Sequence, residues 1–101
     1  MKLSELCSVL KDYIADNDAV ANYEICHADF GAMNESSIVI DDDKGQIVFS
    51  PNNGDPESVV ACLLEYEEEY ADYQVCHVEF GALMESDRVE LNDKRKTIII
   101  C

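Results

Sequence analysis

The sequence predicts an α+β fold made of two copies of one unit, a helix followed by a three-stranded antiparallel meander. A phrase of fourteen residues recurs after fifty, as YEICHADFGAMNES from Tyr23 and as YQVCHVEFGALMES from Tyr73. Apolar residues at helical spacing precede each phrase, and short apolar runs separated by turn residues follow it. These observations together indicate a tandem duplication.

The repeat extends well beyond the shared phrase. Aligned without gaps, residues 23–50 and 73–100 share eleven identities in twenty-eight positions. A fixed period of this kind is typical of a duplicated supersecondary unit. We therefore expect a single domain of two repeats, residues 1–50 and 51–101, with pseudo-twofold symmetry. The helices should lie on one face of a joined six-stranded sheet.

Each unit is expected to open with a helix. In the second unit, Asp55 is the predicted N-cap, Pro56 the first helical residue and Glu57 part of the first turn. Apolar residues at helical spacing mark the buried side of that helix: Val59, Leu63, Tyr66 and Tyr70. The equivalent stripe of the first unit consists of Leu3, Leu6, Cys7, Leu10, Tyr13 and Ile14.

Three strand-like runs follow each helix. They read YEICHADF, SIVID and QIVFS in the first unit, and YQVCHVEF, RVEL and KTIIIC in the second. The turns DDKG and NDKR between the second and third runs suit tight hairpins, and Gly45 can supply a left-handed position. Because the last run is apolar on both sides, it lies centrally in the sheet or is covered by a second subunit.

The adjacent Cys and His of each phrase should point to opposite faces of a strand. The side chains expected beneath the helices are those of Cys26, Ala28 and Phe30, with Cys76, Val78 and Phe80. His27 then shares the solvated face with Asp29, and His77 shares it with Glu79, as polar pairs or as a repeated site.

This alternation argues against chemistry at the Cys-His pairs. Side chains on opposite faces cannot converge on one metal ion or form a nucleophile and base. The five cysteines include no C-x-x-C spacing, so we expect reduced thiols. The stretch from Asp41 begins like a calcium loop, but Asn52 stands where a bidentate Glu is needed. We therefore expect no metal, no cofactor and no enzymatic activity.

The net charge of −15 is the strongest functional signal. Residues 1–50 contain ten acids and three bases, and residues 51–101 contain twelve and four, so the acid belongs to the whole folded unit. Like charges repel, which argues against direct binding of nucleic acid or an anionic membrane. No apolar run approaches the roughly 20 residues that span a bilayer, and no secretory signal is evident, so the cytoplasm is the expected location.

The charge favours an acidic inhibitor that binds the basic surface of a nucleic-acid-binding protein as a DNA mimic. Glu65, Glu68, Glu69 and Asp72 form an acidic helical stripe, with carboxylates about 5–6 Å apart, whereas Glu67 falls near the apolar side. The other candidate partner-binding residues are Asp41, Asp42, Asp43, Asp29 and Glu79. In size and charge the chain is similar to small acidic phage proteins that block defence nucleases, including anti-CRISPR proteins, and to immunity proteins or antitoxins against nucleases.

The alternative interpretation is an acidic structural or assembly module. In that case the acid serves solubility, and the protein forms a homodimer through the partly apolar sheet face opposite the helices.

Overall fold

The computed structural model describes residues 1–52 and 58–101. Its helical elements are α1 (Leu3–Asp16), the 3₁₀-helix η1 (Asp18–Asn22), α2 (Val60–Leu64) and α3 (Glu67–Tyr70). Its strands are β1 (Glu24–Asp29), β2 (Ala32–Asp41), β3 (Gln46–Pro51), β4 (Gln74–Glu79), β5 (Ala82–Glu85), β6 (Val89–Asn92) and β7 (Thr97–Ile100). The fold is α+β, as the sequence predicts.

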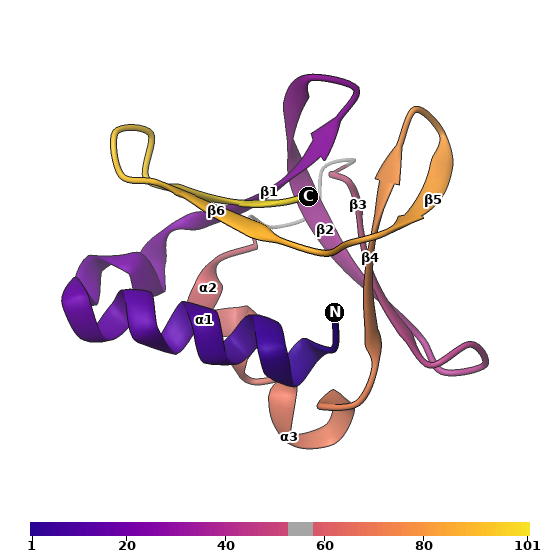
Figure 1. Ribbon diagram of the computed structural model, residues 1–101, viewed down its shortest axis with the longest axis horizontal. Helices are drawn as coiled ribbons and strands as arrows, with labels where there is room; N and C mark the ends of the chain where they lie inside the picture. Colours follow the sequence, from indigo (N-terminus) through magenta and orange to yellow (C-terminus); the bar gives the residue numbers. More distant parts are fainter. Residues whose placement is uncertain (53–57) are drawn as a thin grey trace.

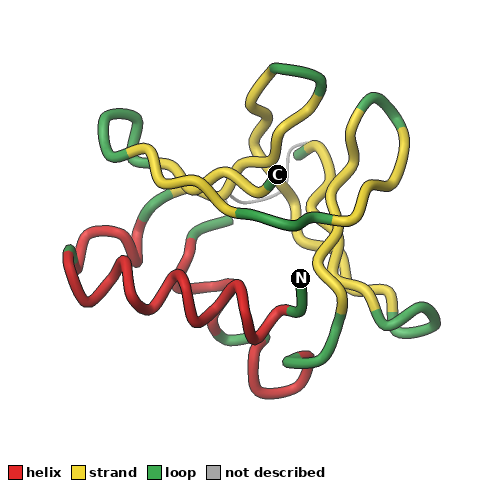
Figure 2. Tube along the Cα trace, in the orientation of Figure 1, coloured by secondary structure: helices red, strands yellow, loops and turns green. Residues whose placement is uncertain are grey.

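The strands form one curled, mixed sheet in the order β5-β4-β3-β2-β1-β7-β6. Sequential hairpin neighbours are antiparallel, whereas β1 pairs with β7 and β3 pairs with β4 in parallel. Figures 1 and 2 show the helices together on one side of this sheet. The hairpins β1–β2 and β4–β5 project on the other side (Figure 1).

The strands of the second half of the chain flank those of the first half on both sides. β7, from the end of the chain, completes the edge of β1, while β3, from the first half, completes the edge of β4. Within the hairpins the registers correspond: Cys26 lies opposite Glu35, and Cys76 lies opposite Glu85. β2 pairs first with β1 and then with β3, whereas the equivalent stretch of the second half is divided into β5 and β6.

The expected six-stranded sheet is wrong, because the described residues form seven strands and the sheet is mixed. The extra strand arises because residues 86–88 interrupt the strand of the second half, giving β5 and β6, whereas β2 is continuous. In both halves a two-residue turn precedes this stretch. Phe30 and Gly31 have φ of +48° and +86°, and Phe80 and Gly81 have +52° and +74°, so the chain reverses within two residues. It therefore re-enters the sheet at Ala32 and Ala82.

The core lies between the helices and the sheet face that they cover. Four residues of the predicted α1 stripe are completely buried: Leu3, Leu6, Cys7 and Leu10. They pack with Tyr23, which follows η1, and with buried residues of the strands and α2, namely Ile25, Ile47, Phe49, Val60, Leu63, Val75, Ile98 and Ile100. Each fully buried Leu, Ile or Phe contributes roughly 1.5–3 kcal/mol. None of the helices in the described ranges is long and apolar enough to cross a membrane.

The second-unit helix is shorter than predicted and broken. Val59 is extended and forms a bridge with Glu24, so α2 begins only at Val60. The amide of Tyr66 donates to the carbonyl of Leu63 at 3.0 Å, a 3₁₀-type bond that tightens the backbone between α2 and α3. The predicted start at Asp55, Pro56 and Glu57 lies outside the described residues.

The predicted orientation of the Cys-His strands is wrong. Ile25 and His27 are completely buried, and their strand neighbours Ile98 and Ile100 are also buried, so this is the face beneath the helices. Cys26 is only 3% exposed, on the other face. Since consecutive residues are all buried, both faces of β1 are covered, and alternation could not identify the inner one.

Candidate protein-interaction surface

Three tyrosine rings lie in a row from the start of α3 to the start of β4. The ring centroids of Tyr66 and Tyr70 are 6.1 Å apart, and those of Tyr70 and Tyr73 are 4.9 Å apart. Backbone bonds set this spacing, because the amide of Tyr70 donates to Tyr66 O at 3.0 Å and the amide of Tyr73 donates to Tyr70 O at 2.9 Å. Each successive turn of the chain therefore adds one ring to the row.

The turn between β2 and β3 joins this row. The amide of Gln74 donates to the carbonyl of Gly45 at 2.9 Å, which holds the turn beside the start of β4. The Tyr73 hydroxyl donates to Asp42 Oδ1 at 2.7 Å. This hydrogen bond is the main reason that the pKa of Tyr73 rises to about 12. Burial, followed by the Glu69 carboxylate, raises the pKa of Tyr70, so both hydroxyls stay protonated at neutral pH.

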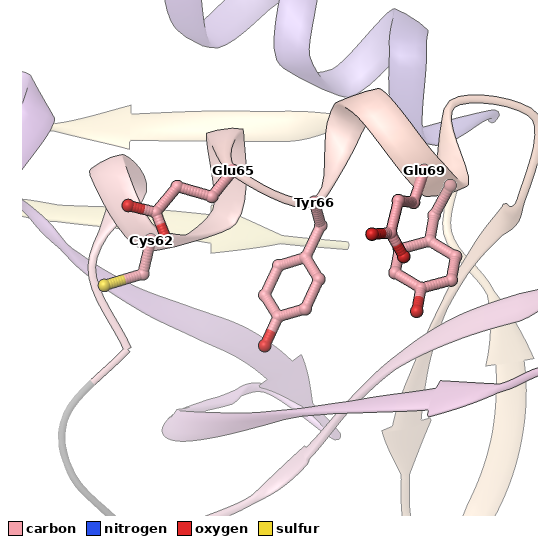
Figure 3. A pocket seen from close by; sticks show the side chains of 5 residues that line it. Cys62, Glu65, Tyr66 and Glu69 are labelled. Atoms are coloured by element: carbon pink, nitrogen blue, oxygen red, sulfur yellow. The ribbon is translucent and has the colours of Figure 1, made fainter.

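Carboxylates and tyrosines together line a hollow beside α2 and α3. Its volume is about 440 Å³, and it is lined by Cys62, Glu65, Tyr66, Glu69 and Tyr70. In Figure 3, Glu65 and Cys62 lie on one side of the Tyr66 ring, and Glu69 lies on the other. We use the name acidic tyrosine surface for Asp42, Glu65, Tyr66, Glu69, Tyr70 and Tyr73.

The predicted acidic stripe is exposed, but it does not lie along one continuous helix. Glu65, Glu68, Glu69 and Asp72 are all exposed. Glu65 lies in the break before α3, and Asp72 follows α3, with its Oδ1 4.0 Å from Lys2 Nζ. Glu67, which had no evident place in the sequence pattern, accepts a hydrogen bond from Lys11 Nζ at 2.5 Å and ties α3 to α1.

The remaining predicted acids fall into two groups. Asp42 joins the acidic tyrosine surface, Asp41 accepts the amide of Lys44 at 3.2 Å within the turn, and Asp43 is exposed there. Asp29 and Glu79 lie elsewhere, at the tips of the projecting hairpins, where both accept backbone amides. The structure thus brings Asp42 close to the Tyr70 and Glu69 region and separates Asp29 and Glu79 from it.

The sequence analysis treated Tyr66 and Tyr70 only as the apolar side of a helix, and Tyr73 only as the start of a strand. Tyr66, Tyr70 and Tyr73 do pack against the core while remaining partly accessible. Tyrosine is enriched at interfaces because its ring can pack against apolar groups while its hydroxyl remains in contact with solvent. The spacing of these tyrosines, among Glu65 and Glu69, was the signal that could have identified the surface.

Two buried His-Ser pairs also escaped the sequence analysis. His27 Nδ1 lies 2.6 Å from Ser36 Oγ, and His77 Nδ1 lies 2.6 Å from Ser86 Oγ. His27 is 0% and His77 is 4% exposed, so the expected solvated polar face is wrong for both. Burial, and next the neighbouring His77, lowers the pKa of His27. The recurrence of His and Ser nine residues apart in both halves was the available signal.

The cysteines are free thiols in the described structure. Burial raises the pKa of Cys7 and of Cys26 to about 11, so both remain protonated at neutral pH. Cys62 is exposed at the rim of the hollow. Within residues 1–52 and 58–101, no three or more His, Cys, Asp or Glu side chains are grouped so that they could hold a metal ion.

Comparison with known proteins gives no relative. No protein-family model, no curated protein and no solved structure matches the chain.

Proposed function

We propose that the protein is a small, acidic, non-enzymatic inhibitor that binds the basic surface of a nucleic-acid-binding protein. The observation that carries this proposal is the acidic tyrosine surface, which combines exposed carboxylates with a row of partly exposed tyrosines. Its closest functional class is the DNA mimic, such as an anti-defence or anti-CRISPR protein of a phage. An immunity protein or antitoxin against a nuclease would use the same chemistry.

The carboxylates supply attraction and speed. A net charge of −15 on a chain of 101 residues produces a field that steers a basic partner toward it. Few of these charges can be neutralised internally, because the chain has 22 acids and 7 Lys and Arg. The ion pairs in the described residues include Lys2–Asp72, Lys11–Glu67 and Arg88–Glu90. Glu65 and Glu68 take part in none of them. Their charge is therefore directed at solvent or at a partner.

The tyrosines supply contact area. Tyr is enriched among residues that dominate binding energy, because its ring is rigid and its hydroxyl can donate a hydrogen bond. In the hollow, Tyr66 lies between Glu65 and Glu69 (Figure 3), and Tyr70 is a further lining residue. A Lys or Arg side chain entering there would meet carboxylate oxygens and aromatic faces together. DNA offers a basic groove the same two features, negative charge and flat rings.

The test is capture of basic proteins followed by competition. The immobilised protein should retain a basic nucleic-acid-binding protein from a lysate at low salt and release it as salt rises. The paired substitution Glu65→Gln/Glu69→Gln should weaken that retention, and duplex DNA should displace the captured protein. Asp12→Asn/Asp16→Asn, which removes the same charge from exposed positions of α1, is the matched control. The proposal fails if nothing basic is retained, or if both paired variants retain it equally.

A second candidate function is the acidic dimeric assembly module. It is favoured by Val39, which is 47% exposed on β2, and by partly buried Val48 and Ile99 in β3 and β7. These side chains would pack against the same surface of a second copy. Light scattering over a range of concentrations tests it, since a stable dimer would show twice the mass of 11.3 kDa.

We further infer that residues 1–50 and 51–101 are copies of one ancestral unit. The matched registers of Cys26 with Glu35 and of Cys76 with Glu85 support this, as do the equal spacings of the two His-Ser pairs. The crosswise parallel pairs, β1 with β7 and β4 with β3, relate the halves in the same way.

A further inference from the structure

The hairpins β1–β2 and β4–β5 end in two exposed phenylalanines that touch each other. Phe30 is 75% and Phe80 is 76% exposed, more than any other large apolar side chain in the described residues. Their ring centroids are 4.9 Å apart, and the ring planes are inclined by 40°. We call these two residues the Phe pair. An apolar pair this exposed at the end of two projecting hairpins contributes little to the core.

The backbone at the Phe pair is unfavourable for phenylalanine. Phe30 has a φ of +48° and Phe80 a φ of +52°. Gly, Asn and Asp are the residues that suit this position of a two-residue hairpin turn, and a bulky side chain there is an outlier. The same unfavourable backbone conformation occurs in both hairpins. Because the rings are exposed, they add no packing to the core that would offset it. A bulky residue at positive φ in both hairpins, without a gain in packing, indicates that these two residues serve a function.

The two tips hold each other in place. The amide of Phe80 donates to Asp29 Oδ1 at 2.6 Å, and the amide of Phe30 donates to Glu79 Oε1 at 3.3 Å. Asn34 Nδ2 donates to the other oxygen of Asp29 at 3.0 Å. Each hairpin therefore fixes the turn of its neighbour, and the Phe pair is organised before any partner arrives. Such preorganisation reduces the entropy lost on binding.

The charge around the Phe pair defines the partner. Residues 26–35 and 76–85, which form the two paired hairpins, contain no Lys or Arg. Their acids are Asp29, Glu35, Glu79 and Glu85. The nearest base along the chain, Arg88, lines a hollow with Gly31, Glu79 and Glu85, where acids outnumber it, and its guanidinium lies 3.9 Å from Glu90 Oε1. A second copy of the chain would bring like charges together here, whereas a cationic side chain finds aromatic rings within a negative field.

We propose that the Phe pair is a docking site for an arginine-bearing protein surface. A guanidinium group stacks on aromatic faces and is more weakly hydrated than an ammonium group, so arginine fits this site better than lysine. The acids of the two hairpins attract the arginine, and the two rings supply the contact. Phe30 and Phe80 are thus binding residues held ready by Asp29 and Glu79.

This site is independent of the acidic tyrosine surface. The hairpin tips project away from the helices, whereas α3 lies on the helical side (Figure 1). One site can therefore fail its test while the other passes.

The test compares octa-arginine and octa-lysine peptides as probes, by isothermal titration calorimetry at physiological salt. Phe30→Asn/Phe80→Asn should weaken octa-arginine binding about tenfold and octa-lysine binding by less than about threefold, as loss of a guanidinium–aromatic contact implies. Val39→Asn, which alters an exposed apolar residue away from the turns, should leave both affinities unchanged. In NMR spectra, octa-arginine should shift the ring signals of Phe30 and Phe80.

The proposal is overturned if the double Asn variant weakens both peptides equally, or if the ring signals do not move. Concentration-dependent dimerisation that this variant abolishes would also overturn it, because a second copy would then be the occupant. Should the double variant lose its native amide spectrum, Phe80→Leu must show the same selective loss. If Glu65→Gln/Glu69→Gln reduces binding while the Phe variants do not, the acidic tyrosine surface stands and the Phe pair fails.

Discussion

The strained turns at Phe30 and Phe80 make a quantitative prediction about stability. Replacing each Phe by Asn keeps the turn but removes a bulky residue from the left-handed region, which Gly, Asn and Asp tolerate and which costs other residues roughly 1–2 kcal/mol. The rings also stabilise each other, and an aromatic pair contributes about 0.5–1.5 kcal/mol beyond its buried area. Because each ring is about three-quarters exposed, its burial adds only roughly 0.5 kcal/mol of the 1.5–3 available.

These contributions predict that each single variant loses stability, whereas the double variant gains it. Phe30→Asn relieves one turn, about 1.5 kcal/mol, but loses the whole ring contact, about 2 kcal/mol, so it should destabilise by roughly 0.5 kcal/mol. The double variant Phe30→Asn/Phe80→Asn relieves both turns and loses the same single contact. It should therefore be more stable than the natural protein by about 1 kcal/mol.

Urea unfolding followed by far-ultraviolet circular dichroism measures this difference. With a slope of about 1–2 kcal/mol per M, the midpoint of the double variant should rise by roughly 0.5–1 M. Phe80→Asn alone is the matched comparison and should behave like Phe30→Asn. A double variant less stable than either single one would refute the reasoning, because the turns would then not be strained.

Four further measurements test the interior. Since burial lowers the pKa of His27, the unfolded chain takes up a proton that the folded protein refuses, so stability should be full above about pH 6.5 and fall as the pH drops below it. A His27→Gln variant should flatten that fall. Ser36→Ala leaves Nδ1 of buried His27 without its partner and should cost about 1–3 kcal/mol in urea unfolding; a cost near zero would contradict the role of this bond. Phe49→Ala, at a completely buried position, should cost about 3–5 kcal/mol, and a midpoint close to that of the natural protein would contradict the described core. Iodoacetamide should modify exposed Cys62 in the native protein before it reaches buried Cys26, a difference that mass spectrometry resolves and that equal labelling rates would disprove.

The helical stripe of α1 could be predicted from the sequence because it depends on local spacing. Leu3, Leu6, Cys7 and Leu10 face one side of a single helix, and that side is buried. The turn at Gly45 could be predicted for the same reason, since its φ of +64° favours glycine. Features set by residues close in sequence were thus accessible.

The faces of β1 could not be predicted, because they depend on distant partners. Ile25 and His27 face the helices only because β7 lies beside β1 in a register that places Ile98 and Ile100 on the same side. The parallel pair of β1 with β7 joins opposite ends of the chain, and no local pattern specifies it. An argument from alternating side chains assumes that one face of the strand is exposed to solvent. Cys26 is only 3% exposed, so neither face of β1 is.

The candidate site was predictable in charge but not in shape. Glu65 and Glu69 were identified by their position on an acidic stripe. The 3₁₀ turn at Tyr66 that separates α2 from α3 is not indicated by any sequence pattern. The link from Tyr73 to Asp42 crosses thirty-one residues of sequence, so only the folded chain reveals that the two acidic segments adjoin.

Because β1 pairs with β7 and β3 pairs with β4, each half of the chain completes the sheet edges of the other half. A fragment of residues 1–52 would expose the edges of β1 and β3, and a fragment of residues 58–101 would expose those of β4 and β7, the strands that pair with them. Mixed together, the two fragments should reassemble without a covalent connection, giving a split protein whose association reports proximity. The hairpin tips would form a second contact between the fragments, because Asp29 accepts the amide of Phe80 and Glu79 accepts the amide of Phe30.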